Sequence, residues 1–117
     1  MIDTELSMAV RFPATGIGII DIQGDLTGTS EKVLMAAYEE ASKNGTKSII
    51  LNFSDLDYMN SSGIGLLVTM LIRVQRQKQN LMAYGLSEHY QQIFDLTRLN
   101  EAIGIYENEA AAVSSAS

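Results

Sequence analysis

The stretch Leu51–Leu67, LNFSDLDYMNSSGIGLL, changes from one secondary-structure pattern to another. Isoleucine, leucine and phenylalanine dominate Ser48–Phe53, which predicts a short buried strand. After two serines and a glycine, apolar residues recur at the helical spacing i, i+3, i+4 and i+7, namely Ile64, Leu67, Val68 and Leu71. The stretch therefore predicts a strand that leads directly into a largely buried helix.

The chain before this stretch predicts a hairpin and a helix. Residues from about Glu5 to Phe12 alternate weakly, and Gly16–Gly24 is almost continuously apolar, so a first strand turns back into a second at Pro13–Gly16. From about Thr29 to Lys43 one helical face is apolar, made by Leu34, Ala37, Tyr38 and Ala41. Asn44 and Gly45 then supply a left-handed stop for that helix.

The chain after this stretch predicts two more strands. These are Asn80–Gly85 and Ala102–Tyr106, with a helix between them that Ser87 caps and that carries Tyr90, Ile93, Phe94 and Leu96. Strands that alternate with helices imply right-handed crossovers and a largely parallel sheet, which the initial hairpin makes mixed. We predict an α/β fold with a single domain over residues 1–107. The alanine- and serine-rich residues 108–117 predict a frayed C-terminal tail.

Composition and charge restrict the partners of the protein. With 117 residues, 46% hydrophobic and 19% charged, the chain has the composition of a globular domain. Eight Lys and Arg against 14 Asp and Glu give a net charge of −6, which disfavours nucleic acid and anionic membranes. The acidic surface indicates either a basic patch on another protein as partner or a charge that serves solubility alone. The N-terminus lacks a basic leader, and the longest apolar run, Ile64–Ile72, is far shorter than the ~20 residues that span a bilayer. We expect a cytoplasmic protein without membrane insertion.

The residue inventory disfavours an enzyme. Cysteine is absent, and the one histidine, His89, lies early in a predicted helix as a surface residue. Neither Ser61 nor Ser62 stands in a G-x-S-x-G motif, and no glycine-rich phosphate loop occurs. Asp55 and Asp57 are interpreted as loop acids beyond a strand because the other ligands of a calcium loop are missing. We predict no catalytic residues, metal or cofactor, and keep a hydrolase that uses either serine as a remote alternative.

A phosphoaspartate receiver is a second alternative, because receivers are similar in size and in their alternation of strands and helices. A receiver needs clustered acids after its first strand and a lysine near the C-terminal end. The last lysine here, Lys78, precedes the fourth predicted strand. The receiver interpretation is therefore disfavoured.

Two features of the serine-glycine junction leave alternatives open. Ser61 is either a helix N-cap, worth ~1 kcal/mol, or an exposed hydroxyl that chemistry can reach. Gly63 and Gly65 each cost roughly 1 kcal/mol relative to alanine within a helix. They indicate either tight packing of the helix on its own sheet or the approach of a partner surface.

The segment Leu51–Leu67, together with Ile22–Gly28 (IQGDLTG), resembles STAS domains of the anti-sigma factor antagonist type. That family has a strand, an acidic loop and then aspartate-serine-serine (or threonine)-glycine leading into an apolar helix. The order of predicted elements agrees with the family from about Thr4 to Tyr106. The resemblance implies the STAS fold and a non-enzymatic binding switch that is monomeric when free.

The resemblance also implies partners and site residues. Such antagonists capture an anti-sigma factor, often a serine kinase of the histidine-kinase-like ATPase class, and a serine phosphatase reverses the phosphorylation. The phosphorylated serine corresponds to Ser61, and Asn60 stands where the family has aspartate. The partner-binding residues carried over are Gly24, Asp25, Leu26, Thr27, Thr29, Asn60, Ser62 and Gly63.

Two further contacts are predicted from the helix itself. The polar side of this helix carries Thr69, Arg73 and Arg76, and Leu66 and Met70 border it. We expect these two residues to extend the partner-binding surface that begins at Asp25 and Leu26. For Met70 the alternative is that it fills the core. Because Asn60 removes a negative charge beside the serine, kinase recognition that uses this charge would be weakened. The alternative function is an unphosphorylated STAS scaffold or a regulatory subunit of a stress-sensing or lipid-transport complex.

Overall fold

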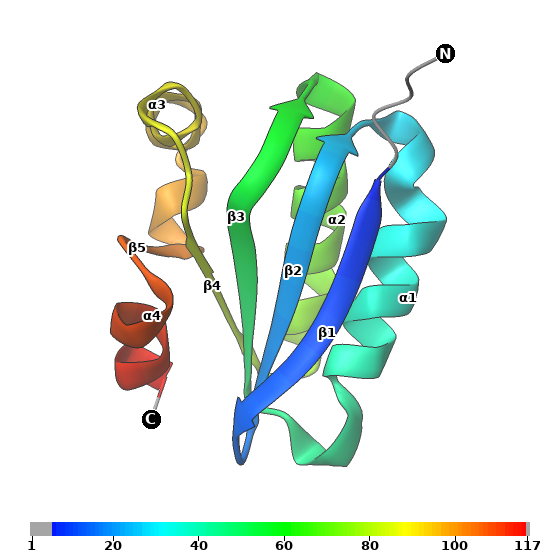
Figure 1. Ribbon diagram of the computed structural model, residues 1–117, viewed down its shortest axis with the longest axis vertical. Helices are drawn as coiled ribbons and strands as arrows, with labels where there is room; N and C mark the ends of the chain where they lie inside the picture. The colour runs from blue at the N-terminus through cyan, green and yellow to red at the C-terminus, as the bar shows by residue number, and fades with distance from the viewer. Residues whose placement is uncertain (1–5, 117) are drawn as a thin grey trace.

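A computed structural model describes residues 6–116 as a five-stranded sheet covered by helices on both faces (Figure 1). The elements in chain order are β1 (Ser7–Ala14), β2 (Ile17–Leu26), η1 (Gly28–Ser30), α1 (Glu31–Ala41), η2 (Lys43–Gly45), β3 (Ser48–Met59), α2 (Ser61–Arg76), β4 (Asn80–Tyr84), α3 (Glu88–Leu96), η3 (Leu99–Glu101), β5 (Gly104–Tyr106) and α4 (Glu109–Ala116). The strand order is β1-β2-β3-β4-β5; β1 is antiparallel to β2, and the other pairs are parallel. The predicted mixed, mostly parallel sheet with an N-terminal hairpin is confirmed. Thr4 and Glu5 lie outside the described residues.

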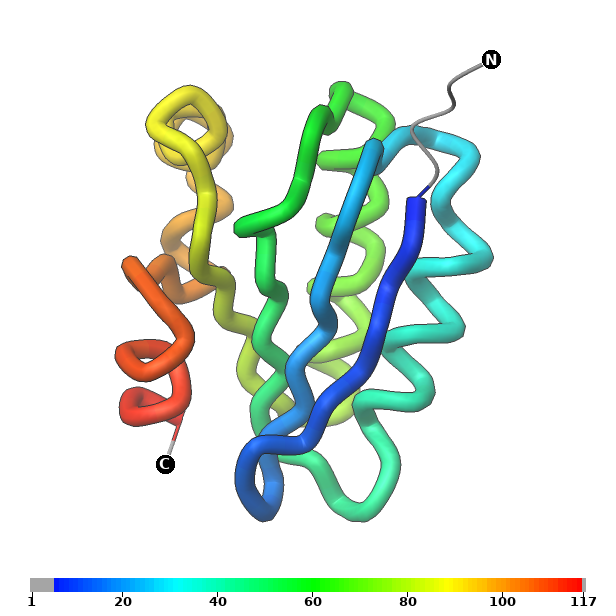
Figure 2. The backbone as a smooth tube through the Cα atoms, viewed as in Figure 1, coloured from blue at the N-terminus to red at the C-terminus, as the bar shows by residue number. Residues whose placement is uncertain are grey.

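The central strands bury both faces because successive side chains point to opposite sides of the sheet. In β2, Ile20 and Ile22 join the main core beneath α1, α2 and α3, whereas Ile17 and Ile19 join a smaller cluster beneath α4. Ile50 of β3 is fully buried in that second cluster. The sheet is therefore an apolar layer between two helical layers of unequal size (Figures 1 and 2).

The first helix and its stop follow the prediction. The four apolar side chains predicted on one face of α1 are all buried. Asn44 and Gly45 adopt the left-handed conformation at φ 62° and 72°. Ser87 accepts a hydrogen bond from the backbone N–H of Tyr90 at 3.4 Å, so the predicted cap of α3 is also confirmed.

The prediction of a frayed C-terminal tail is wrong. Residues Glu109–Ala116 form α4, which lies against β3, β4 and β5 (Figure 2). Ala112 is fully buried, and Val113 and Ala116 pack beside it at the spacing of one helical face. Small side chains let this helix approach the sheet closely even though they bury little area each.

Two element boundaries and the exposure of one residue also differ from the prediction. Asp55 and Asp57 lie within β3 rather than in a loop, because β3 continues pairing with β2 as far as Met59. The last strand is only Gly104–Tyr106, since η3 takes up the preceding turn. Val68, predicted on the buried face of its helix, is 38% exposed.

Candidate functional site

The junction between β3 and α2 is capped by Asn60. The side-chain oxygen of Asn60 accepts a hydrogen bond from the backbone N–H of Gly63 at 2.9 Å, while its backbone is extended (φ −98°, ψ −179°). Ser61 is the first helical residue, is exposed and forms no hydrogen bond through its hydroxyl to any residue in the range 6–116. The interpretation of Ser61 as the helix cap is therefore wrong, because the preceding asparagine satisfies that N–H.

Gly63 brings α2 into direct contact with the end of β2. A Cβ on Gly63 would collide with the backbone carbonyl of Leu26. That same carbonyl accepts a hydrogen bond from the N–H of Asn60 at 3.3 Å. Of the two interpretations left open for this glycine, internal packing is correct, and its effect is to hold the segment after β2 beside Ser61.

The segment after β2 places further hydroxyls beside this junction. The backbone N–H of Thr27 donates to Oγ of Ser30 at 2.9 Å, which closes the turn. The hydroxyls of Thr27 and Thr29 lie 3.0 Å apart, and a Cβ on Gly28 would lie 3.2 Å from Cβ of Ser62. We call Thr27, Gly28, Thr29, Ser61 and Ser62 together the junction surface.

Several residues predicted to contact a partner lie beneath this surface. Leu26 and Met70 are fully buried, so neither has any surface for a partner to contact, and these two predictions are wrong. Gly24 and Gly63 are buried as well; Gly24 has a positive φ of 101°, and Gly63 lies against the carbonyl of Leu26. Met70 is core filler, as the alternative interpretation held, because α2 turns its Leu67–Met70–Val74 side toward the sheet.

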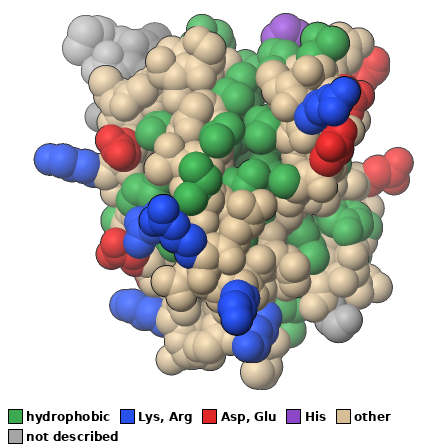
Figure 3. Space-filling model, turned by 180° about the vertical axis from the view of Figure 1, so that it is seen from behind, with side chains coloured by type: hydrophobic (Ala, Val, Ile, Leu, Met, Phe, Trp, Pro, Cys, Tyr) green, Lys and Arg blue, Asp and Glu red, His purple; other side chains and the backbone are tan. Residues whose placement is uncertain are grey.

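Two exposed residues of α2, Val68 and Ile72, were missed as contacts by the sequence-based prediction, and Gly65 was named there with two interpretations left open. Ser61, Gly65, Val68 and Ile72 follow the spacing i, i+4, i+7 and i+11, so they share one face of the helix. Val68 and Ile72 are 38% and 46% exposed, and a Cβ on Gly65 would meet no atom within 4 Å. We call these four residues the α2 stripe; hydrophobic side chains gather along this helical side of the molecule in Figure 3. The spacing counted from Ser61 is the signal that could have found them.

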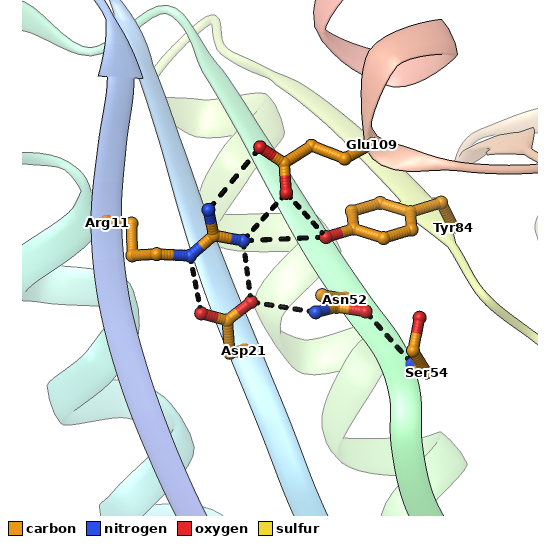
Figure 4. Close-up of polar contacts among 6 residues, drawn as sticks. All are labelled: Arg11, Asp21, Asn52, Ser54, Tyr84 and Glu109. Carbon is orange, nitrogen blue, oxygen red and sulfur yellow. Dashed lines mark hydrogen bonds and ion pairs between the residues drawn. The ribbon is translucent and has the colours of Figure 1, made fainter.

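The shifted pKa values belong to a cluster on the opposite face of the sheet (Figure 4). Arg11 donates to Asp21 at 2.6 and 2.9 Å and to Glu109 at 2.9 and 3.4 Å, and these hydrogen bonds lower the pKa of both carboxyls. Burial, with a hydrogen bond to Glu109, raises the pKa of Tyr84 to about 12. Asn52 completes the cluster by donating to Asp21 at 2.8 Å. Because these groups satisfy one another, the cluster anchors α4 to β1 and β2.

The described residues offer few groups for other chemistry. Within residues 6–116 no three His, Cys, Asp or Glu side chains gather where they could hold a metal ion. His89 is exposed, as predicted, and its ring lies 5.0 Å from that of Tyr90. No helix in the described part of the chain has the length and apolarity needed to cross a membrane.

A family model for the STAS domain matches residues 13–112. The chain belongs to the STAS domain family. Its similarity to an anti-sigma-B factor antagonist of Staphylococcus epidermidis reaches 32% identity over 77 residues, which cover 66% of this chain and 68% of the relative. The family predicted from the serine-serine-glycine junction is thus confirmed.

Solved STAS structures share the fold at low sequence identity. The crystal structure of an anti-sigma factor antagonist from Mycobacterium paratuberculosis gives a TM-score of 0.81 at 12% identity and covers 98% of this chain and 97% of that one. The Bacillus cell fate determinant SpoIIAA in its phosphorylated form gives 0.71 at 20% identity, with 93% and 98% covered. A sulfate transporter family protein from Wolinella succinogenes gives 0.77 at 16% identity, with 91% and 88% covered. Because proteins of different function share this fold, function must be argued from the site.

Proposed function

We propose that this STAS protein is an anti-sigma factor antagonist that binds its anti-sigma factor through the junction surface and the α2 stripe and is released when Ser61 is phosphorylated. The observation that carries the proposal is the geometry of Ser61. Its hydroxyl is exposed, makes no hydrogen bond within residues 6–116 and is not needed for capping, because Asn60 has that role. Chemistry at Ser61 can therefore change the surface without removing a contact that holds the fold together.

Phosphate at Ser61 would be compatible with the fold and unfavourable for a bound partner. It adds about −1.5 to −2 charges at the first position of α2, where the positive end of the helix dipole stabilises an anion. Asn60 is uncharged, so it does not repel this phosphate as an aspartate would. At an interface complementary to a neutral serine, losing ~3 kcal/mol weakens binding roughly a hundredfold, which is sufficient to release a partner.

Gly65 supports a partner that approaches the α2 stripe closely. A glycine there costs roughly 1 kcal/mol of helix stability relative to alanine, and no atom of the described chain needs the space it leaves. Val68 and Ile72 lie on the same face and offer apolar surface that association would remove from water. The proposed contacts are therefore Ser61, Gly65, Val68 and Ile72.

Six of the remaining predicted contacts reach the surface of the protein. Asp25, Thr27, Thr29, Asn60, Ser62 and Leu66 are exposed or half-buried. The partner we propose is an anti-sigma factor that is itself a serine kinase, since one protein then both binds the junction surface and modifies its hydroxyl. A serine phosphatase would restore the binding form. The observations in support are the resemblance of the junction motif to the family and the names of the similar relatives.

The experiment is a comparative pull-down from lysate of the native host. The baits are the wild type, Ser61→Ala and Ser61→Asp, with Ser62→Ala and Ser62→Asp as matched controls one residue away. We expect the wild type, Ser61→Ala and both Ser62 variants to retain the same anti-sigma factor, identified by mass spectrometry. Ser61→Asp should lose it and keep a melting temperature close to that of the wild type.

Three other outcomes would contradict parts of this proposal. Equal recovery of the same partners by all baits would favour the constitutive scaffold or regulatory subunit. A large fall in melting temperature for Ser61→Asp would mean that this serine supports the fold. Absence of phosphoserine after incubation with the captured kinase and ATP would leave the antagonist role without the switch.

A further inference from the structure

Basic side chains gather at the end of the molecule opposite Ser61. Five of the eight Lys and Arg residues follow or end the two long helices: Lys43, Lys47, Arg73, Arg76 and Lys78. Figure 3 shows Lys and Arg side chains over the lower half of the face formed by α1 and α2. We call these five residues the basic end. Glu39 lies among these five cations, and the three other cations share the rest of the chain with 13 Asp and Glu.

Most of these cations have no anionic partner in the chain. Lys43, Lys47, Arg76 and Lys78 form no ion pair with any residue from 6 to 116, and all four are exposed. Only Arg73 is held, at 3.6 Å from Glu39 and over the ring of Tyr38. The helix dipole favours cations in the last turn of a helix, but its effect fades within that turn. It does not account for Lys47, which immediately precedes β3.

A mostly polar hollow of about 420 Å³ lies at the basic end, between the C-terminal ends of α1 and α2. Two of the five cations, Lys47 and Arg73, line it together with Gln79 and with Glu39, the ion-pair partner of Arg73. The amide of Gln79 accepts from the hydroxyl of Tyr38 at 2.7 Å and donates to the carbonyl of Thr46 at 3.1 Å. The N–H of Asn80 donates to the carbonyl of Lys47 at 2.8 Å, which fixes the two chain segments relative to each other. These hydrogen bonds join the chain segments that line the hollow.

We propose that the basic end is a second docking surface that binds an acidic segment of a partner protein, independently of Ser61. Charge complementarity and the hollow argue for a short segment whose carboxylates meet Lys43, Lys47 and Lys78. A long polyanion or an anionic bilayer would extend beyond the basic end and meet the acidic remainder of the chain. The hollow itself is lined mainly by polar side chains, whereas membrane-surface sites combine cations with apolar groups that insert. One such apolar group, Phe12, is 46% exposed and lines a neighbouring hollow with Lys43, so a lipid surface is tested directly below.

The first test is a titration followed by backbone amide NMR shifts of the whole chain. The probe is a capped peptide of about six glutamates, and a peptide of glutamines of the same length is the control. We expect shifts at residues 43–47 and 73–80 with the glutamate peptide alone, weakening as ionic strength rises because the contacts are solvent-exposed. The double variant Lys43→Glu/Lys47→Glu should weaken binding of the glutamate peptide about tenfold or more. The control is the double variant Lys32→Glu/Arg98→Glu, which changes the net charge by the same amount and should leave binding of this peptide unchanged.

Two residues with a left-handed backbone conformation, one after α2 and one after α3, offer a more closely matched pair of variants. Lys78 and Arg98 both have positive φ, 57° and 61°, where glycine is less strained. Each change to glycine removes one cation and relieves the same left-handed backbone strain. Lys78→Gly should stabilise the protein and weaken peptide binding, whereas Arg98→Gly should stabilise it without affecting the peptide. Asn44→Gly, which changes no charge beside Lys43, should also leave binding intact.

Three results would overturn this proposal. One is the absence of shifts at the basic end at millimolar glutamate peptide and low salt. Another is equal weakening of peptide binding by Lys78→Gly and Arg98→Gly, which would mean that net charge alone explains the effect. The third is stronger binding to phosphatidylcholine vesicles that contain about 30% phosphatidylserine, which would replace the acidic protein segment with a lipid surface. Because Ser61→Asp should leave peptide binding unchanged, failure here is distinguishable from failure of the proposed switch.

Discussion

The two faces of the sheet are covered in different ways. On one face, α1, α2 and α3 bury a large apolar core with fully buried residues such as Leu34, Leu67 and Phe94. On the other, α4 covers a small cluster in which it contributes one fully buried residue, Ala112. The ion pairs and hydrogen bonds of Arg11 then fix the start of α4. One face is therefore stabilised by the apolar area that it removes from water, whereas the other depends mainly on a few ion pairs and hydrogen bonds.

The two faces also differ in what they present to solvent. The apolar core supports the α2 stripe and the junction surface from beneath, so these surfaces are held rigidly. The Arg11 cluster lies on the far side of the sheet and contacts neither of them. Substitutions in the apolar core can therefore be compared with substitutions in the Arg11 cluster, and partner binding can be measured separately for each.

The largest expected effect is from a cavity in the main core. Leu67→Ala should lower the free energy of unfolding by about 3 kcal/mol, because a fully buried leucine loses its contacts and the fixed sheet cannot close the cavity. Urea denaturation followed by circular dichroism measures this change. Leu96→Ala is the control, since this leucine is 84% exposed and should change stability little. A loss below about 1 kcal/mol for Leu67→Ala would contradict the contrast between the faces.

A smaller and more local effect is expected from Arg11→Ala. Its two ion pairs are 29–42% exposed, so solvent screens them and the loss should be about 1–2 kcal/mol. Hydrogen exchange should rise mainly in α4, because Arg11 is the hub that joins Glu109 to Asp21. Arg98→Ala, at an 82% exposed side chain, is the matched control. Unchanged protection in α4 would mean that apolar packing alone holds this helix.

The same contrast predicts a pH dependence for the α4 face. Hydrogen bonds from Arg11 lower the folded pKa of Asp21 and Glu109, so their stabilisation is present above the unfolded pKa of about 4. It is lost as pH falls through the lowered folded values. The stability difference between the wild type and Arg11→Ala should therefore be constant near neutrality and shrink below about pH 4. Urea titrations at a series of pH values test this, and a difference that grows in acid would contradict it.

The smallest expected effect is that of Gly65→Ala, and Gly63→Ala in the same helix is its contrast, with a larger effect of opposite sign. Gly65→Ala should raise the free energy of unfolding by up to about 1 kcal/mol, because the new Cβ meets open space and alanine favours the helix. Gly63→Ala should lower stability, since its Cβ would collide with the carbonyl of Leu26. Thermal melts of both variants measure the opposite signs. A destabilising Gly65→Ala would show that this glycine serves the fold, and would remove one support for a partner approaching the α2 stripe.

The sequence by itself determined the fold class, the order of the elements and the family. These follow from local patterns: the apolar face of α1, the left-handed stop at Asn44 and Gly45, and the serine that caps α3. The junction motif also identified Ser61 as the residue to examine. Such features depend on neighbours a few positions away in the chain, so they can be read from the sequence alone.

Only the tertiary structure decided which side chains around Ser61 face solvent. Helical periodicity predicted Val68 on the buried face of α2 and Met70 at the border of its polar side, but the position of the helix on the sheet buries Met70 and exposes Val68. The choice between capping by Asn60 and by Ser61 depended on where the helix begins. The docking of α4 depended on a contact between Arg11 and Glu109, 98 residues apart, which no local pattern contains.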